Sequence, residues 1–243
     1  MTQEKNKDSK SSDGVTEVRK REHIETILKS DVVAKGVTTG FEQFTLEHCA
    51  MPEIDLDSID LSVPLFGITL QAPILISSMT GGVSQGGIIN RRLAECAQAL
   101  GLAMGLGSQR AAIEQSSLAE TYKVRDVAPD ILLFANLGAV QLNYGYGIDE
   151  ARRAVDMIEA NALFIHLNPL QEAVQPEGDR NWSGILKKLE KLISEIGVPV
   201  VVKEIGAGLS AELVRKLLAI GVSAVDVAGA GGTSWSEVEA KRQ

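Results

Sequence analysis

From residue 70 onward the chain repeats one pattern of hydrophobic and polar positions. A short run of apolar or β-branched residues is followed by glycine, serine or asparagine, and then by a helical pattern. Neighbouring runs begin roughly 30 residues apart, which is the length of one strand–helix unit. The runs cover residues 72–77, 102–107, 131–137, 162–167, 198–203 and 222–228. We therefore predict six strands that alternate with helices.

Amphipathic helices are predicted between these strands. The helix before the second strand places its apolar residues on one face, and Gly101 is well placed to end it. Its apolar face consists of Ile89, Leu93, Ala97 and Leu100. Asn181 and Ser210 are the predicted N-caps of the helices before the fifth and sixth strands. An earlier charged helix is expected at residues 18–29, followed by an irregular stretch that contains Phe41, Phe44 and Leu46.

Polar or glycine-rich residues follow nearly every predicted strand. Apolar strands that alternate with helices indicate a parallel sheet covered by helices, either doubly wound or closed as a barrel. A doubly wound sheet concentrates its site at one switch point, whereas a barrel collects residues from all its strand ends at one mouth. We therefore predict an α/β fold of the TIM (β/α)8-barrel type. Because eight units need about 60 further residues, we expect a truncated barrel of about six units.

Composition and charge limit the remaining possibilities. Residues 1–16 are polar and predicted to be a disordered leader, and residues 17–243 are predicted to form one incomplete barrel domain. The formal net charge of −8 disfavours nonspecific binding to nucleic acid or to an anionic membrane surface. Cys49 and Cys96 have no metal-site or disulfide spacing, which fits a reduced, cytoplasmic setting. No apolar run is long enough to span a membrane.

The segment HLNPLQE, at the end of the fourth predicted strand, carries the most informative side chains. His166 and Asn168 are two residues apart on a strand, so they face the same side. Pro169 is expected to end the strand, and Gln171 and Glu172 to lie in the loop beyond. A carboxylate beside an amide suits Mg²⁺ carried in with substrate phosphates. The alternative is a satisfied core histidine and a solvated loop glutamate.

Three further features suggest anion or cofactor binding, and each has an ordinary structural alternative. The glycine-rich turns at residues 79–82 and 229–233 permit close approach of a phosphate or a planar ring, or are simply tight turns. Lys203 ends the fifth strand and is predicted to hold a phosphate or flavin ring, or to reach toward solvent. Residues 19–23 form a basic cluster that is either a diphosphate clamp or a solvated helix start.

The sequence contains no nucleophile elbow, readable Ser/His/Asp set or HExxH motif, and this points to chemistry carried by a cofactor. Together, the segments RKREH, SSMTGG, GLGSQR, ANLGA, HLNPLQEAVQPEGD, VVVKEIGAG and GAGGTSW resemble type 2 isopentenyl-diphosphate isomerase. The resemblance covers residues 18–236. HLNPLQE following SSMTGG is highly specific, whereas GGT or a strand-end lysine occurs in several FMN barrels.

The resemblance implies an activity and a site. Members interconvert isopentenyl and dimethylallyl diphosphate in isoprenoid biosynthesis, with FMN reduced by NAD(P)H acting as acid and base. The implied FMN contacts are Ser78, Met79, Thr80, Ser108, Asn136, Lys203 and Thr233. The implied substrate contacts are Arg19, Lys20, His23, Ser108, Gln109, Arg110, Asn168 and Gln171. His166 and Gln171 are the expected catalytic residues, Glu172 the expected Mg²⁺ ligand, and a homo-oligomer the expected assembly.

Two alternatives remain at this point. One is an FMN barrel of the hydroxyacid-oxidase or glutamate-synthase type, which would lack the HLNPLQE pattern and the N-terminal basic cluster. The other is a catalytically inert fragment of the isomerase, because family members continue through two more strands that bring a Gly-Gly turn for the FMN phosphate. Unpaired edge strands would then remain exposed.

Overall fold

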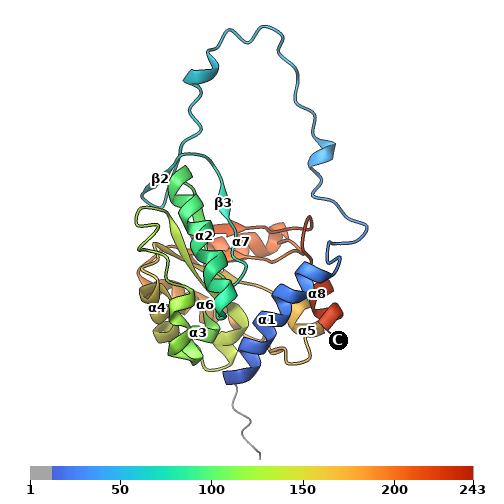
Figure 1. Ribbon diagram of the computed structural model, residues 1–243, viewed down its shortest axis with the longest axis vertical. Helices are drawn as coiled ribbons and strands as arrows, with labels where there is room; N and C mark the ends of the chain where they lie inside the picture. Colours follow the sequence, from blue (N-terminus) through green and yellow to red (C-terminus); the bar gives the residue numbers. More distant parts are fainter. Residues whose placement is uncertain (1–12, 243) are drawn as a thin grey trace, which may run out of the picture.

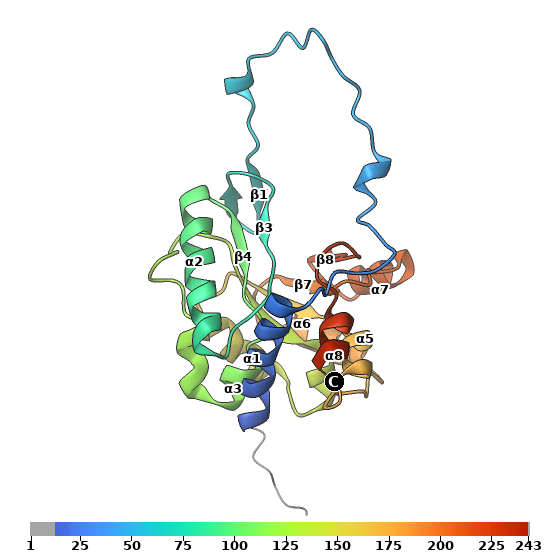
Figure 2. The same ribbon diagram turned by 45° about the vertical axis from the view of Figure 1, so that its right-hand side comes forward.

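The computed structural model describes residues 13–242, with side chains from residue 18 onward. Six parallel strands form one curled sheet, and their order in the sheet is their order in the sequence (Figures 1 and 2). They are β3 (Leu75–Ile76), β4 (Ala103–Gly105), β5 (Leu133–Gly138), β6 (Ala162–His166), β7 (Val200–Lys203) and β8 (Ala224–Asp226). Each lies within a predicted run or extends one residue beyond it, so the prediction of six units of a parallel β/α barrel is confirmed.

The register of the sheet aligns the carboxyl ends of its central strands. His166 pairs with Gly138 on one side and with Lys203 on the other. Lys203 in turn pairs with Asp226. The ends of β5, β6, β7 and β8 therefore form one rim, as a barrel requires.

Helices cover the outer face of the sheet, as predicted. They are α2 (Ser84–Leu100), α3 (Arg110–Glu114), α4 (Ile148–Met157), α6 (Ile185–Ile196) and α7 (Ala211–Ala219). Two further helices, α5 (Pro169–Val174) and α8 (Trp235–Arg242), pack against each other, and α8 also packs against α1 (Asp13–Lys29). The short 3-10 turn η3 (Ser116–Thr121) follows α3, and η4 (Ala139–Asn143) lies between β5 and α4. Gly101 ends α2 in the left-handed conformation, and Ser210 caps α7 by accepting from Leu213 N–H. The prediction that Asn181 caps the next helix is wrong. Its side chain accepts from Ser183 N–H in a local turn, and α6 begins only after Gly184.

A hairpin that the sequence pattern did not predict closes the inner face of the sheet. Strands β1 (Val63–Leu65) and β2 (Ile68–Leu70) pair in antiparallel fashion. Their turn residues, Phe66 and Gly67, both have positive φ, as a tight two-residue hairpin turn needs. Phe66 packs edge-on against Phe134, which stacks on Phe164 with ring centroids 4.3 Å apart. Alternate strand residues thus serve two cores, one under the helices and one inside the curl.

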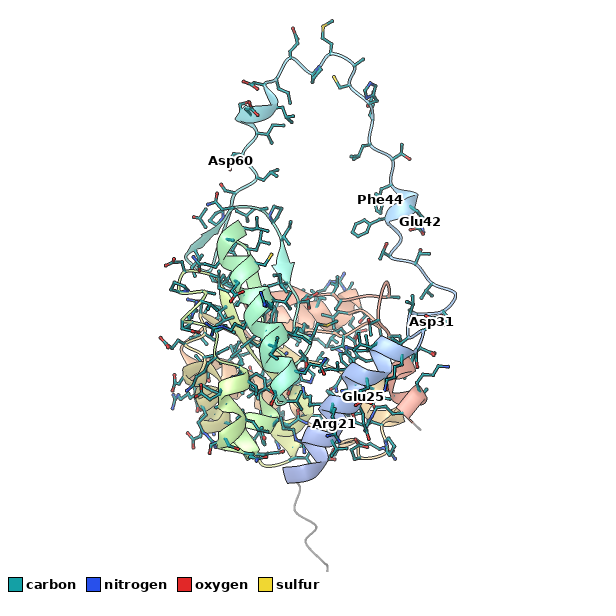
Figure 3. The ribbon with its side chains drawn as sticks, viewed as in Figure 1. Arg21, Glu25, Asp31, Glu42, Phe44 and Asp60 are labelled. Carbon is teal, nitrogen blue, oxygen red and sulfur yellow. The ribbon has the colours of Figure 1, made fainter. Side chains whose placement is uncertain are left out.

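The segment between α1 (Asp13–Lys29) and the hairpin extends away from the sheet (Figures 1 and 3). It contains only the short turns η1 (Phe41–Gln43) and η2 (Leu56–Ser58), so the predicted irregular stretch is confirmed. Phe44 and Asp60 both lie on this projecting segment in Figure 3. Of the predicted leader, residues 1–12 lie outside the described residues, and the last four belong to α1. No helix within residues 13–242 has the length and apolar character to cross a bilayer.

Candidate active site

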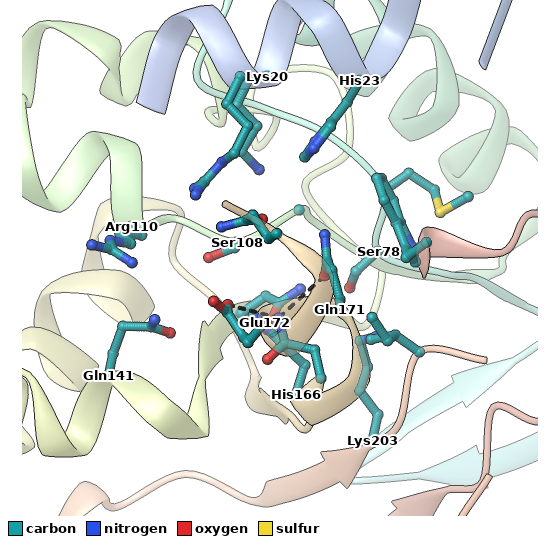
Figure 4. Close-up of a pocket in the computed structure, with 18 residues that line it drawn as sticks. Lys20, His23, Ser78, Ser108, Arg110, Gln141, His166, Gln171, Glu172 and Lys203 are labelled. Atoms are coloured by element: carbon teal, nitrogen blue, oxygen red, sulfur yellow. Dashed lines mark hydrogen bonds between the residues drawn. The ribbon is translucent and has the colours of Figure 1, made fainter. Parts of the chain in front are cut away.

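A pocket lies at the carboxyl ends of the strands, beneath α1 (Figure 4). It is lined by most of the residues singled out from the sequence: Arg19, Lys20, His23, Ser78, Met79, Ser108, Arg110, Asn136, His166, Asn168, Gln171, Glu172 and Lys203. The residues come from helices α1, α3 and α5, from strands β5, β6 and β7, and from the loops after β3, β4 and β6. Side chains that are far apart in the sequence therefore face one space.

The remaining predicted site residues lie elsewhere. Thr233 lines an adjoining cavity together with the glycine-rich turn after β8. Thr80 lines neither cavity, and its carbonyl accepts from the Gly107 N–H. Gln109, expected to touch substrate, is fully buried, and its amide bonds Ala154 O at 2.8 Å and Asn136 N at 3.0 Å. It therefore supports the β5 strand from behind.

Gln171 and Glu172 were expected in a loop, but they lie in the helix α5. Pro169 occupies the first turn, where its fixed φ and missing N–H are tolerated, so it starts a helix as well as ending the strand. Glu172 is buried, which rules out the solvated-loop alternative. Its carboxylate accepts from Asn168 Nδ2 at 2.9 Å and from Asp179 N–H at 2.7 Å. Burial raises the pKa of Glu172, although these hydrogen bonds oppose it.

His166 is held in a defined tautomer. Its Nδ1 lies 2.8 Å from Asn136 Oδ1, and Asn136 Nδ2 donates to Leu106 O, which fixes the orientation of that amide. Nδ1 must therefore carry the proton, so that Nε2 is left as an acceptor. Burial, with the nearby charges of Lys203 and Lys20, lowers the pKa of His166 to about 3. The imidazole is neutral at physiological pH.

Cations from α1 and α3 gather at the upper side of the pocket. Burial and the neighbouring Arg19 lower the pKa of Lys20 to about 7. Arg110 is already paired, with Glu114 at 2.7 Å and Asp179 at 2.6 Å. Arg21, from the same cluster as Arg19 and Lys20, is exposed and outside the pocket. An anion entering the pocket would thus meet Arg19 and Lys20 first.

The helix α8 contributes a buried carboxylate that the sequence did not single out. Glu239 accepts from Gln171 Nε2 and His23 Nε2, each at 2.9 Å, and pairs with Arg242. Gln175 links the same carboxylate to Arg19, with its amide oriented to donate to one and accept from the other. Burial alone would raise the pKa of Glu239, but hydrogen bonds from His23, Gln171 and Arg242 lower it to about 2. This network fixes α1, α5 and α8 around the pocket.

Sequence reasoning missed Glu239, Gln175, Gln141 and Trp235, all of which line the pocket or bond its residues. A signal for Glu239 was present. Trp235, Val238, Glu239 and Arg242 follow the spacing of one helical face, and a glutamate beside a buried valine on such a face is a candidate for a buried ion pair.

The glycines of the turn at residues 79–82 are required by packing within the protein. A Cβ on Gly81 would lie 2.1 Å from the Tyr122 ring, and one on Gly82 would lie 2.8 Å from Ala111. Tyr122 is fully buried and donates to Ser108 O at 2.7 Å. The side chain of Tyr122 therefore joins the loops after β3 and β4.

Two buried polar atoms of the pocket lack hydrogen-bond partners within residues 13–242. Ser78 Oγ and Asn168 Oδ1 have no hydrogen-bond partner among the described residues. The Lys203 ammonium donates only one long bond there, 3.3 Å to Glu204 O. Burial lowers the pKa of Lys203, although Asp226 and Glu204 act in the opposite direction. Such donors and acceptors fit the polar edge of a planar cofactor, because buried polar groups normally find partners.

A metal ion would find few protein ligands here. Within residues 13–242, no three His, Cys, Asp or Glu side chains come together as a metal-binding group. Glu172, with the free Asn168 Oδ1 beside it, is the oxygen-rich point of the pocket. This fits a cation such as Mg²⁺ that keeps waters and phosphate oxygens as its other ligands.

The fold and the rim pocket define a β/α-barrel protein with a polar site at the carboxyl ends of its strands. No protein-family model matches the chain. Solved structures with the same fold include a flavocytochrome b2 variant with sulfite bound, at a TM-score of 0.54 and 17% identity over 86% of this chain and 50% of that chain. A mandelate oxidase variant with benzoyl-formic acid has a TM-score of 0.54 and 15% identity, over 88% of this chain and 66% of that chain. At this identity the likeness concerns the fold alone.

Curated relatives are much closer in sequence. A protein of Synechocystis sp. named isopentenyl-diphosphate delta-isomerase is 65% identical over 93% of this chain and 64% of its own length. Proteins of the same name from Nostoc sp. and Stutzerimonas stutzeri are 54% and 56% identical, over 93% and 92% of this chain. The chain is therefore a homologue of the isopentenyl-diphosphate delta-isomerases, and it spans 64–65% of the length of these three relatives.

Proposed function

We propose that the protein interconverts isopentenyl and dimethylallyl diphosphate, with FMN in the rim pocket, as a step of isoprenoid biosynthesis. The observation that carries this proposal is the convergence of two kinds of group in one pocket. Arg19 and Lys20 supply positive charge for a diphosphate. Ser78 and Lys203, on the opposite side of Gln171, offer unfilled hydrogen-bonding capacity for a planar ring (Figure 4).

The residues of the chain would bind and orient both partners. When bound and reduced, FMN supplies acid and base chemistry at the allylic carbons with no net redox change. Lys203 would hold the electron-rich edge of the ring as a point charge. His166 Nε2, an acceptor at neutral pH, would receive a hydrogen bond from the bound groups, and Gln171 would sit between ring and diphosphate. Residues of α1 would exclude water from above.

Glu172 is the proposed protein ligand of Mg²⁺, with the diphosphate supplying further oxygens. Substrate and metal binding should then depend on each other. We propose NAD(P)H as the reductant of FMN, a cytoplasmic location and a homo-oligomeric assembly, all on the strength of the family resemblance. The formal net charge of −8 disfavours a nucleic-acid partner.

Oxidation of a 2-hydroxy acid is the competing function, since flavocytochrome b2 and mandelate oxidase share the fold. The two functions need different recognition. A diphosphate needs several cations, and the pocket offers Arg19, Lys20 and Arg110 together with a buried carboxylate for a metal. We therefore favour the isomerase.

The experiment is an anaerobic assay with FMN, dithionite and Mg²⁺, in which conversion of isopentenyl diphosphate is followed by proton NMR. Because the chain spans less than two thirds of its relatives, it is tested alone and joined to the remaining residues of the Synechocystis relative. Conversion that needs reduced FMN is the expected result. Oxidation of mandelate or lactate by either protein in a parallel aerobic assay without dithionite, together with no isomerisation, would contradict it.

The Mg²⁺ assignment has its own variant. Glu172→Gln should weaken Mg²⁺-dependent binding of the diphosphate while FMN remains bound, because the carboxylate faces the substrate side. Glu190→Gln, on the exposed face of α6, is the matched control and should change neither. Equal loss of FMN and diphosphate in Glu172→Gln would remove Glu172 from the metal role.

A further inference from the structure

The loop after β7 is organised around the side chain of its own first residue. Glu204 Oε2 accepts hydrogen bonds from three successive backbone N–H groups, those of Ile205, Gly206 and Ala207, at 2.7, 2.8 and 2.6 Å. The Glu204 N–H is itself bonded to Asp226 O on β8 at 3.1 Å. The residue is 5% exposed. Its carboxylate is therefore buried within the loop that it begins.

Successive backbone N–H groups that converge on one point form a concave site for an anion. Here the anion is a side chain of the protein. A buried carboxylate would be costly without compensation, and the three charge-assisted hydrogen bonds provide it. Gly206 has φ +149, a conformation that other residues rarely adopt, although a Cβ there would meet no atom within 4 Å. The glycine is thus required by the backbone that wraps the carboxylate.

This loop forms one wall of the cavity that also contains Thr233. Residues 204–207 all line that cavity, together with Lys203. The only hydrogen bond of the Lys203 ammonium within the described residues goes to the carbonyl of Glu204, at 3.3 Å. Glu204 therefore acts on the cavity in two ways: its carboxylate shapes the wall, and its carbonyl holds the lysine.

We propose that Glu204 is a positioning residue, whose carboxylate fixes the loop at 205–207 and sets Lys203 against the flavin. The proposal rests on the proposed function for its ligand. It also assigns the amides of residues 205–207 to Glu204, so they are not the donors that bind the cofactor phosphate. Glu204 itself does not touch the reacting atoms.

The test compares Glu204→Ala and Glu204→Asp with Glu212→Gln, a control that removes an exposed ion pair with Lys216 on α7. Hydrogen exchange of the peptide that covers the loop at 205–207 is measured without cofactor. FMN dissociation constants and visible spectra are measured on the same proteins, alone and joined to the remaining residues of the Synechocystis relative.

In Glu204→Ala the loop amides should exchange faster and FMN should bind about tenfold more weakly, with its spectrum shifted toward that of free FMN; tenfold corresponds to 1.4 kcal/mol. Glu204→Asp should show smaller changes in both amide exchange and FMN affinity than Glu204→Ala, because the aspartate carboxylate still reaches a backbone N–H two residues further on. The control should match the wild type. Faster exchange with unchanged FMN affinity and spectrum would overturn the positioning role, and unchanged exchange would overturn the role of the carboxylate in the loop.

Failure of the proposed function is separable from these outcomes. If neither form of the wild-type protein binds FMN, the role of Glu204 toward the flavin fails together with that function. The exchange measurement still decides whether the carboxylate holds the loop.

Discussion

The Gln171 amide donates from Nε2 to Glu239 Oε1 over 2.9 Å, and this bond joins α5 to α8. The two residues are 68 positions apart in the sequence. The same carboxylate oxygen also bonds His23 of α1. One buried carboxylate thus orients side chains from two helices that cover the pocket.

Removing the charge of Glu239 should loosen this side of the pocket. Glu239→Gln leaves Arg242 with only its outer partners and disturbs both Gln171 and His23. We expect a loss of about 3 kcal/mol in the free energy of unfolding, the scale found when one partner of a buried pair is removed. Urea unfolding measures this loss. Glu190→Gln, an exposed control, should change the free energy of unfolding by close to zero. An equal loss of unfolding free energy in both variants would contradict the buried network.

His166 should make the protein sensitive to mild acid. Its folded pKa of about 3 lies below the ordinary value of 6.5, so the unfolded chain binds the proton first as the pH falls. The contribution to stability is complete above pH 6.5 and is lost progressively toward pH 3. His166→Gln should flatten the dependence of unfolding free energy on pH by up to about 1.4 kcal/mol per pH unit in this window.

The matched control is His48→Gln, because His48 is exposed on the projecting segment. Chemical denaturation at several pH values between 4 and 7 measures the slopes. Identical slopes for His166→Gln and the wild type would show that folding does not lower the pKa of His166.

Lys20 should take up a proton when a polyanion binds. Burial and Arg19 hold its pKa at about 7, so at pH 8 most molecules carry a neutral lysine. Inorganic pyrophosphate would raise that pKa, and uptake should approach about one proton. Calorimetry in two buffers of different ionisation enthalpy measures the uptake. Lys20→Arg, which stays charged, corrects for the protons of pyrophosphate itself, and equal uptake by both proteins would refute the assignment.

Tyr122 should support the rim from behind. Tyr122→Phe keeps the ring beneath Gly81 and removes only the hydrogen bond to Ser108 O. We expect a loss of about 1 kcal/mol in the free energy of unfolding, or somewhat more because the carbonyl is left without this partner. Thermal or urea unfolding measures it. Tyr144→Phe removes a half-exposed hydroxyl bonded to Asn181 N–H and should cost less; the reverse order would contradict this role.

The strands and the convergence of their ends followed from the sequence because both are repeated, local signals. Near-continuous apolar runs with polar residues after them occur in every unit, and the parallel register then places His166 beside Lys203. The spacing of His166 and Asn168 predicted their common pocket for the same reason. These inferences needed only two facts: side chains two residues apart on a strand share a face, and the carboxyl ends of barrel strands meet at one mouth.

Features that depend on tertiary packing could not be read in this way. Gln109 has the polar character of a ligand contact, yet its amide satisfies backbone groups behind β5. Gly81 has the sequence context of a phosphate turn, yet the Tyr122 ring explains it. Glu239 lies outside every recognised motif, and although its helical spacing marks it as a candidate for burial, that spacing does not identify its partners Gln171 and His23. The deciding partners, Asn136 for Gln109, Tyr122 for Gly81 and Gln171 for Glu239, are each at least 27 residues away, beyond the range of local pattern.

The central claim is that one rim pocket holds a flavin and a diphosphate side by side, each with its own cation. Equilibrium titration with FMN tests it most directly, on the wild type, Lys203→Ala and Lys20→Ala, each with and without the remaining residues of the Synechocystis relative. Lys203→Ala should weaken FMN binding about tenfold or more, as expected for loss of a buried charged hydrogen bond. Lys20→Ala should bind FMN as the wild type does. Unchanged affinity in Lys203→Ala, or equal loss in both variants, would contradict the arrangement.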